Sequence, residues 1–285
     1  MTDPARAATG GASAGGSAPR YMSPADMLAL PRPPADHRIA YGENPLQFGD
    51  LFLPRRTPRD KEEFPVALLL HGGCWEAGIG LDHLSGFCVA LAEAGVAAWN
   101  VEYRCLGDPD GGWPGTFLDV LAAHAHVARL RDEYPIDPKR VIVIGHSAGG
   151  HLALWLAASG MATGLRAVLS IAGVTDLSAG AGVGRCAGMV PRLIAPDPLR
   201  APAPLSSVSP VHMDPPSVPV RLITAGHDAV VPPSQAESYL AAVGDRATRL
   251  DLPDSGHFEL ITPGTRPCAT VLAEALRLVE SPSSR

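Results

Sequence analysis

The sequence predicts an α/β fold with a mostly parallel central sheet that is flanked by helices on both faces. Short aliphatic runs, such as Val66–Leu70 and Val141–Ile144, have the length and composition of strands buried on both faces. Longer segments of helical composition alternate with these strands, an order typical of parallel sheets. The connections between them are rich in Gly and Pro, which favour loops.

The first part of the chain is expected to start the sheet. Residues 38–42 and 46–53 are predicted strands in antiparallel pairing, because the second run partly alternates apolar and polar residues. The elements that follow are the buried strand 66–70, a helix at 84–94 that ends before Gly95, and a strand at 96–103.

The second part continues the alternation. A long helix at 117–133 is stopped by Pro135 and Pro138, after which the strand 141–144 and the helix 151–158 follow. Further elements are predicted at 167–172 (strand), 220–225 (strand), 234–243 (helix), 248–252 (strand) and 268–279 (helix). Between 177 and 211 the pattern loosens, with many Pro, Gly and Ala residues, and this stretch is predicted to be a small lid or cap insertion.

Composition narrows the class of protein. With 285 residues the chain is long enough for one α/β domain, predicted over 21–285, while the Ala-, Gly- and Ser-rich residues 1–20 are expected to form a disordered tail. A net charge of −6 provides no basic surface, so neither nucleic acid nor a membrane is an expected partner. Residues 1–20 lack the apolar segment of a signal peptide, and the expected location is therefore cytoplasmic. No oligomeric state is predicted.

The five cysteines suggest free thiols. They are odd in number and lack CxxC spacing, which argues against a disulfide framework and against a zinc site. A single pair, for example Cys105 with Cys186, remains an alternative. The histidines and carboxylates likewise show no metal-binding spacing, so no metal is expected.

A candidate nucleophile lies between the strand 141–144 and the helix 151–158. Gly145-His146-Ser147-Ala148-Gly149 fits Gly-x-Ser-x-Gly. A strand that turns sharply into a helix strains the central residue, and small residues are required two positions to either side to avoid collisions. Ser147 is therefore the predicted nucleophile. It could instead be an ordinary helix N-cap, but a cap does not require small residues on both sides.

The carboxyl ends of two later strands offer a base and an acid. His257 follows the last strand and Asp228 follows the strand before it, and parallel strands bring such ends to one edge of the sheet. His257 is predicted to take the Ser147 proton, and Asp228 to orient the imidazole. The order serine, aspartate, histidine is that of α/β-hydrolases.

Other residues compete for these roles. Asp251 and Asp254 stand too close to His257 on the same strand end, whereas Asp176, after its own strand, is the main rival acid. The remaining histidines near the motifs are expected to pack in the core, to edge the insertion or to shape the acid loop, and these are His151, His212 and His227.

His71-Gly72-Gly73-Cys74 follows an early strand, where glycines let backbone N–H groups approach a carbonyl oxygen. The N–H groups of Gly73, Cys74 and Ala148 are the predicted oxyanion hole. Aromatic residues flank this centre and could wall a substrate pocket, although large aromatics are as often plain core; they are Trp75, Trp113 and Phe258.

Two motifs carry a family resemblance. With His-Gly-Gly-x-Trp at 71–75 and Gly-His-Ser-Ala-Gly-Gly-His-Leu-Ala at 145–153, the chain after residue 38 resembles the α/β-hydrolase superfamily. Within it, the motifs are similar to those of kynurenine formamidases and small esterases, a group that includes enzymes akin to feruloyl and acetylxylan esterases.

The resemblance implies a cofactor-free serine hydrolase that cleaves the carboxylic ester of a small acyl group through an acyl-enzyme on Ser147. One alternative is an aryl formamidase acting on N-formylkynurenine. A second is a binding protein that keeps the fold without catalysis. In the first two cases the partner is a small-molecule ester or formamide.

Overall fold

A computed structural model describes residues 20–55, 63–178, 186–199 and 201–280. The tail expected at 1–20 lies outside the described residues except for Arg20. Among the described helices, none combines the length and the apolar character that crossing a membrane requires.

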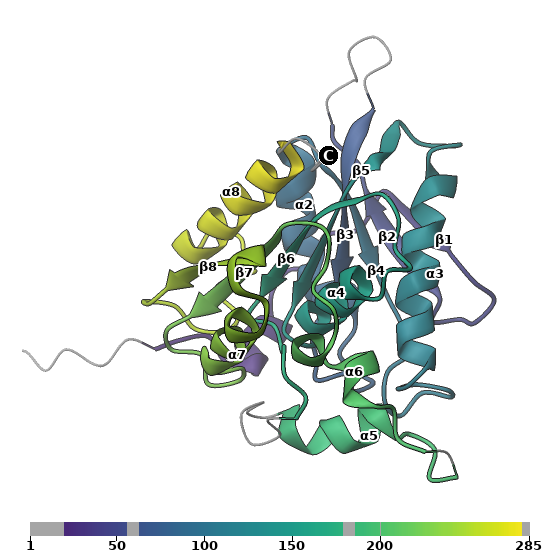
Figure 1. Ribbon diagram of the computed structural model, residues 1–285. Coiled ribbons are helices and arrows are strands. Elements are labelled where there is room, and N and C mark those ends of the chain that lie inside the picture. Colours follow the sequence, from purple (N-terminus) through teal and green to yellow (C-terminus); the bar gives the residue numbers. More distant parts are fainter. Residues whose placement is uncertain (1–19, 56–62, 179–185, 200, 281–285) are drawn as a thin grey trace, which may run out of the picture.

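An eight-stranded sheet forms the centre of the protein, as predicted (Figure 1). The strand order is β1-β2-β4-β3-β5-β6-β7-β8, and β2 pairs antiparallel with both β1 and β4, whereas the other neighbours are parallel. The strands are β1 (His37–Ala40), β2 (Phe48–Phe52), β3 (Phe64–Leu70), β4 (Ala97–Val101), β5 (Ile136–His146), β6 (Leu165–Ile171), β7 (Val220–Ala225) and β8 (Ala247–Leu252). The expected antiparallel start and parallel remainder are thus confirmed.

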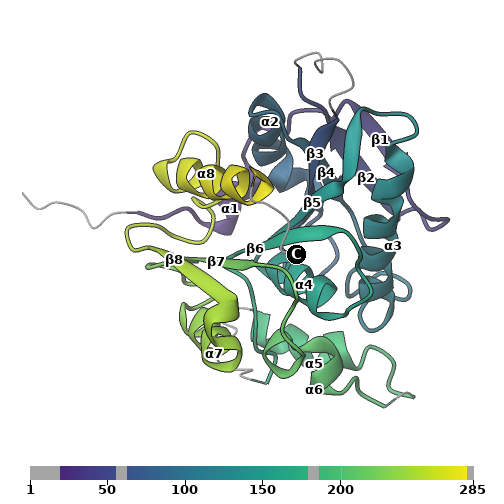
Figure 2. The same cartoon turned by 45° about the horizontal axis from the view of Figure 1, so that its top comes forward.

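Helices cover both faces of this sheet. Figure 2 shows α2 (Ser85–Glu93) and α8 (Arg266–Glu280) on one face, and α3 (Gly115–Leu130), α4 (Ala148–Ala158) and α7 (Ser234–Val243) on the other. The strands divide their side chains accordingly. In β3, Leu68 belongs to the core under α3 and α4, while Leu69 belongs to the core under α2 and α8. This two-sided burial is why the strands are continuous apolar runs.

Two of the differences from the prediction concern β5 and α1. β5 begins at Ile136 and so includes Pro138, which was expected only to end the preceding helix. Its early part pairs little, with Phe64 opposite Ile136 and the next paired residues at Val66 and Val141, so a missing N–H is tolerated there. The short helix α1 (Pro24–Leu28) was not predicted, because one turn has no measurable period.

The stretch 177–211, predicted as a lid, is described except for 179–185 and 200. It contains α5 (Val190–Ile194), α6 (Leu205–Val208) and the 3-10 helix η3 (Pro210–His212). Two side chains of α4 fix it in place. Trp155 Nε1 donates to the carbonyl of Ser207 over 2.9 Å, and His151 Nε2 lies 2.7 Å from the carbonyl oxygen of Val208. The part of the stretch around α6 therefore packs on α4.

Candidate active site

Ser147 occupies a strained turn between β5 and α4. Its backbone has φ 57° and ψ −119°, a region that non-glycine residues rarely adopt. The neighbouring glycines leave no room for a side chain. A Cβ on Gly145 would lie 2.0 Å from the carbonyl oxygen of Gly149, and a Cβ on Gly149 would lie 2.0 Å from that of Leu70. The steric reason given for the Gly-x-Ser-x-Gly spacing is confirmed.

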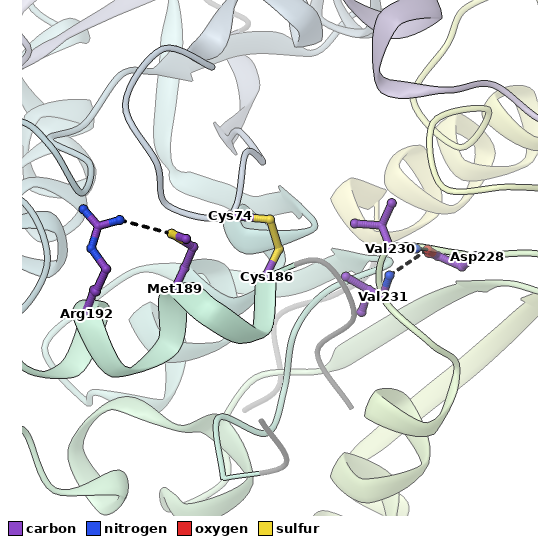
Figure 3. Close-up of a disulfide and its surroundings, with 7 residues drawn as sticks. All are labelled: Cys74, Cys186, Met189, Arg192, Asp228, Val230 and Val231. Carbon is purple, nitrogen blue, oxygen red and sulfur yellow. Dashed lines mark hydrogen bonds between the residues drawn. A yellow bond between two sulfur atoms is a disulfide. The ribbon is translucent and has the colours of Figure 1, made fainter. Parts of the chain in front are cut away.

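His257 and Asp228 form a buried pair. Nδ1 of His257 lies 2.7 Å from Oδ2 of Asp228, and the two side chains are 3% and 1% exposed. The other carboxylate oxygen accepts the N–H groups of Val230 and Val231 at 2.8 and 2.7 Å (Figure 3). Because an ionised carboxylate can only accept, Nδ1 of His257 carries the proton and Nε2 is left as the basic nitrogen.

The rival acids have other partners. Asp176 accepts the backbone N–H of Ser178 at 2.9 Å, and Asp251 binds the side chains of Thr224 and Arg249. Of the other histidines, His151 is buried in the core as expected, His212 contacts Ser209, and His227 stacks on Tyr21.

A cavity of about 150 Å³ opens beside Ser147 and His257. The loop after β3 contributes Gly73 and Cys74 to it, and Phe258 forms part of its wall. Phe258 also packs edge-on against the His257 ring, with ring centroids 4.9 Å apart. Of the three aromatics expected at the pocket, Phe258 is among the residues that line this cavity.

The two tryptophans do not line this cavity. Trp75 is fully buried and packs against the edge of the His151 ring, so it belongs to the core. Trp113 lines a separate cavity of about 630 Å³, together with Arg104 and Arg192. The sequence motif places Trp75 next to Cys74 but does not show that its side chain turns into the core, and it does not show which cavity the loop of Trp113 lines. The described residues of 177–211 are also missing from the cavity wall beside Ser147.

The loop after β3 is held in an unusual conformation. Gly73, Cys74 and Trp75 have φ values of 117°, 53° and 57°. Two backbone hydrogen bonds fix the turn: Glu76 donates to Gly73 at 3.0 Å and Leu106 donates to Trp75 at 2.6 Å. Within the described chain, the N–H groups of Gly73 and Cys74 donate to no backbone carbonyl.

A partly buried ion pair lies at the start of this loop. Nε2 of His71 lies 2.9 Å from Oε1 of Glu102, and its Nδ1 lies 2.7 Å from the carbonyl oxygen of Gly72. Both partners are acceptors, so both ring nitrogens carry protons. Burial alone would lower the pKa of His71, but the charge and hydrogen bond of Glu102 outweigh it and leave that pKa raised. The Tyr103 ring stacks on His71, and its hydroxyl donates to the His71 carbonyl at 2.6 Å.

The roles of His71 and Glu102 were not predicted from the sequence. The available signal was their position, because each directly follows one of the adjacent parallel strands β3 and β4. Parallel neighbours that end in register bring such residues together.

A disulfide joins Cys74 to Cys186, as Figure 3 shows. The expectation of free thiols is therefore wrong for these two, as is the alternative pairing of Cys105 with Cys186. Cys88, Cys105 and Cys268 are free and buried. The disulfide connects the loop that lines the cavity to the first described residue after the gap in the 177–211 stretch. Two segments far apart in the sequence are thus fixed side by side.

Two further histidines line the cavity in their neutral form. Burial, with a smaller contribution from the charge of His71, lowers the pKa of His83 to about 3. Burial and then the neighbouring His257 and His83 also place the pKa of His146 well below its ordinary value. The His146 ring lies against that of His257, with centroids 4.5 Å apart. The surroundings of His257 thus carry little added positive charge at neutral pH.

A metal centre has no counterpart in the described part of the chain, where no three His, Cys, Asp or Glu residues gather in a way that could hold an ion.

Comparison with known proteins identifies the family. The family model named BD-FAE matches residues 50–242, which include the glycine loop, Ser147 and Asp228. Among characterised relatives, Esterase LipC of Mycobacterium tuberculosis is 27% identical over 270 residues, covering 87% of this chain and 66% of its own length. The probable carboxylic ester hydrolase LipM of the same organism is 34% identical over 141 residues, covering 49% of this chain and 32% of its own. The chain thus spans less than two thirds of either relative.

Solved structures share the fold. Esterase B from Lactobacillus Rhamnosis superimposes with a TM-score of 0.73 at 21% identity, over 89% of this chain and 88% of that one. The same esterase has been crystallised with a tributyrin phosphonate inhibitor, and that structure also gives a TM-score of 0.73. The matched family model, which spans more than half of the chain, and this shared architecture show that the protein belongs to the BD-FAE family of the α/β-hydrolase superfamily.

Proposed function

We propose that this protein is a serine ester hydrolase that acts on carboxylic esters of small acyl groups. The observation that carries the proposal is the buried contact of His257 with Asp228, with His257 and Ser147 on the wall of one small cavity. The esterase relatives in the same family support this class of reaction.

The proposed reaction has two halves. In the first, Nε2 of His257 takes the proton of Ser147 as its Oγ attacks the ester carbonyl carbon, and the proton then passes to the departing alcohol oxygen. In the second, a water molecule that is deprotonated by His257 attacks the acyl-enzyme, and the acid leaves as Ser147 regains its proton. Asp228 holds the imidazole by Nδ1 and stabilises its positive charge.

The oxyanion that forms in each half needs donors. Gly73 and Cys74 line the cavity and their N–H groups lack backbone acceptors, while Ala148 begins α4 directly after Ser147. We assign these three N–H groups to the oxyanion hole, where the positive end of α4 adds to their effect. Removal of one such donor typically costs ~10²–10³ in rate.

Two measurements test the proposal. The first is hydrolysis of p-nitrophenyl acetate and butyrate by the wild type and by Ser147→Ala. The second is labelling by a fluorophosphonate, followed by intact mass and peptide mapping. We expect turnover by the wild type alone and one phosphonyl group on Ser147. Equal rates for both proteins, with no label, would leave the binding-protein alternative. Inclusion of N-formylkynurenine separates an esterase from an aryl formamidase by the ratio of kcat/KM values.

A further inference from the structure

The short helix α1 is built to stay folded despite its five residues. Ser23 caps it by accepting the N–H of Asp26, and the Asp26 carboxylate accepts the N–H of Ser23 at 2.9 Å in return. Pro24 stands in the first turn, where a missing N–H costs nothing. Such a reciprocal capping box satisfies the donors that would otherwise unravel one turn.

The residues just before α1 attach it to both loops that hold the His257–Asp228 pair. The Tyr21 ring stacks on His227, the neighbour of Asp228, with centroids 4.5 Å apart and planes within 17°. The N–H of Met22 donates to the carboxylate of Glu259, two residues after His257. A Cβ on Gly256 would lie 2.8 Å from that of Tyr21, so the contact is close. The helix is thus positioned relative to the catalytic groups.

One face of α1 forms part of the wall of the 150 Å³ cavity. Pro24, Met27 and Leu28 line it together with Ile79 and Phe258, so this side is apolar. Met27 is 4% exposed and lies within the wall, whereas Leu28 is 42% exposed and lies at its rim. A cavity of roughly this volume holds a group about the size of benzene. The wall therefore limits what can occupy the space beside Ser147.

Of the two parts of an ester substrate, the acyl group stays beside Ser147 longer. The alcohol leaves in the first half of the reaction, whereas the acyl group stays on Ser147 until water attacks. A small walled cavity suits the group that remains. We propose that Met27 is a specificity-determining residue that limits the enzyme to short acyl chains. This inference rests on the proposed ester hydrolysis and adds the determinant of its acyl selectivity.

The test uses p-nitrophenyl esters from acetate to decanoate, with kcat/KM measured for each. For the wild type, kcat/KM is expected to fall steeply once the acyl chain is longer than the cavity can hold. Met27→Ala opens the wall, and each further methylene that it accepts is expected to raise kcat/KM by about fourfold. Met27→Phe narrows the cavity, so butyrate is expected to lose activity before acetate does. Met161→Ala is the matched control, because Met161 is 59% exposed and lies outside the cavity lining.

Met27→Ala and Met27→Phe change the cavity in opposite directions, so either one alone can test the proposal if the other is unstable. Thermal melts show whether a variant is unstable. Unchanged chain-length profiles in both variants, with normal acetate hydrolysis, would overturn the role of Met27 and leave the esterase proposal intact. The role of Met27 in acyl selectivity would also be overturned if its variants changed kcat/KM only in a series of acetate esters with different alcohols. No hydrolysis of any ester by the wild type, with no phosphonate label, would overturn both proposals.

Discussion

Removal of the Cys74–Cys186 disulfide is expected to affect stability and turnover separately. The perturbations are Cys186→Ala and reduction of the wild type by a dithiol, which is oxidised to its cyclic disulfide as the protein gains two thiols. The two cysteines are 112 residues apart in the sequence. Chain entropy gives about 4.7 kcal/mol for a loop of roughly 100 residues, so the melting temperature should fall by roughly 10 °C.

The effect on turnover follows from the place of Cys74. It lines the cavity beside Ser147, and we assign its N–H to the oxyanion hole. Once the link is broken, the donor is expected to move, which lowers kcat by at least about tenfold and at most by the ~10²–10³ of a lost donor. KM is expected to change little, because the donor acts mainly in the transition state.

The assay measures kcat and KM at 25 °C, well below the lowered melting temperature, together with thermal melts. Cys268→Ala is the matched control, because it removes a buried cysteine that has no disulfide. Thiol titration of denatured, unreduced protein should find three free thiols among the five cysteines. Five free thiols would show that the disulfide does not form. A lower melting temperature with an unchanged kcat would refute the positioning argument and leave a purely stabilising link.

Three further predictions concern buried titratable groups. Asp228→Asn should lower kcat by about 10⁴, because an amide cannot hold the tautomer of His257 that Ser147 requires, and ester hydrolysis measures this. Glu102→Ala should lower the free energy of unfolding in urea by at most about 3–5 kcal/mol, because buried His71 loses the carboxylate that keeps its second proton bound. Burial lowers the pKa of His151 to about 4, against 6.5 in an unfolded chain, so the unfolded state binds more protons between these values. Stability should therefore fall by about 2 kcal/mol from this residue between pH 7 and pH 5, and urea unfolding of His151→Gln should lack this contribution. An equal pH dependence in both proteins would contradict it.

Much of the fold was predictable because burial on both faces leaves a direct mark in the sequence. The run Val141–Ile144 is apolar throughout because alternate residues pack under opposite helix layers. Val141 and Val143 belong to the core under α3 and α4, and Ile142 and Ile144 belong to the core under α2 and α8. The turn at Ser147 was predictable for a different reason. Atoms of Gly149 and Leu70 occupy the space that side chains at Gly145 and Gly149 would need. The turn therefore requires glycine at both positions, and the sequence shows this requirement directly.

The remaining features depend on which distant loops meet. The disulfide joins Cys74 to Cys186 across 112 residues of sequence, and spacing along the chain carries no trace of that contact. Trp113 was misplaced for the same reason. The cytoplasmic location stays a prediction, and the disulfide argues against it, because such bonds persist in oxidising compartments. The sequence did not predict that Met27 lines the cavity, because α1 is a single helical turn and too short to show a hydrophobic period.

The two ends of the described chain have different practical uses. Arg20 leads into α1 at the cavity beside Ser147, whereas α8 starts after the His257 loop and runs back along the sheet for about 22 Å to Glu280 (Figure 1). Because α1 lines this cavity, a fusion partner or surface anchor joined before Arg20 is expected to crowd the entrance to it. One joined after Glu280 would leave that entrance open, so immobilisation for assay or screening belongs at the carboxyl end.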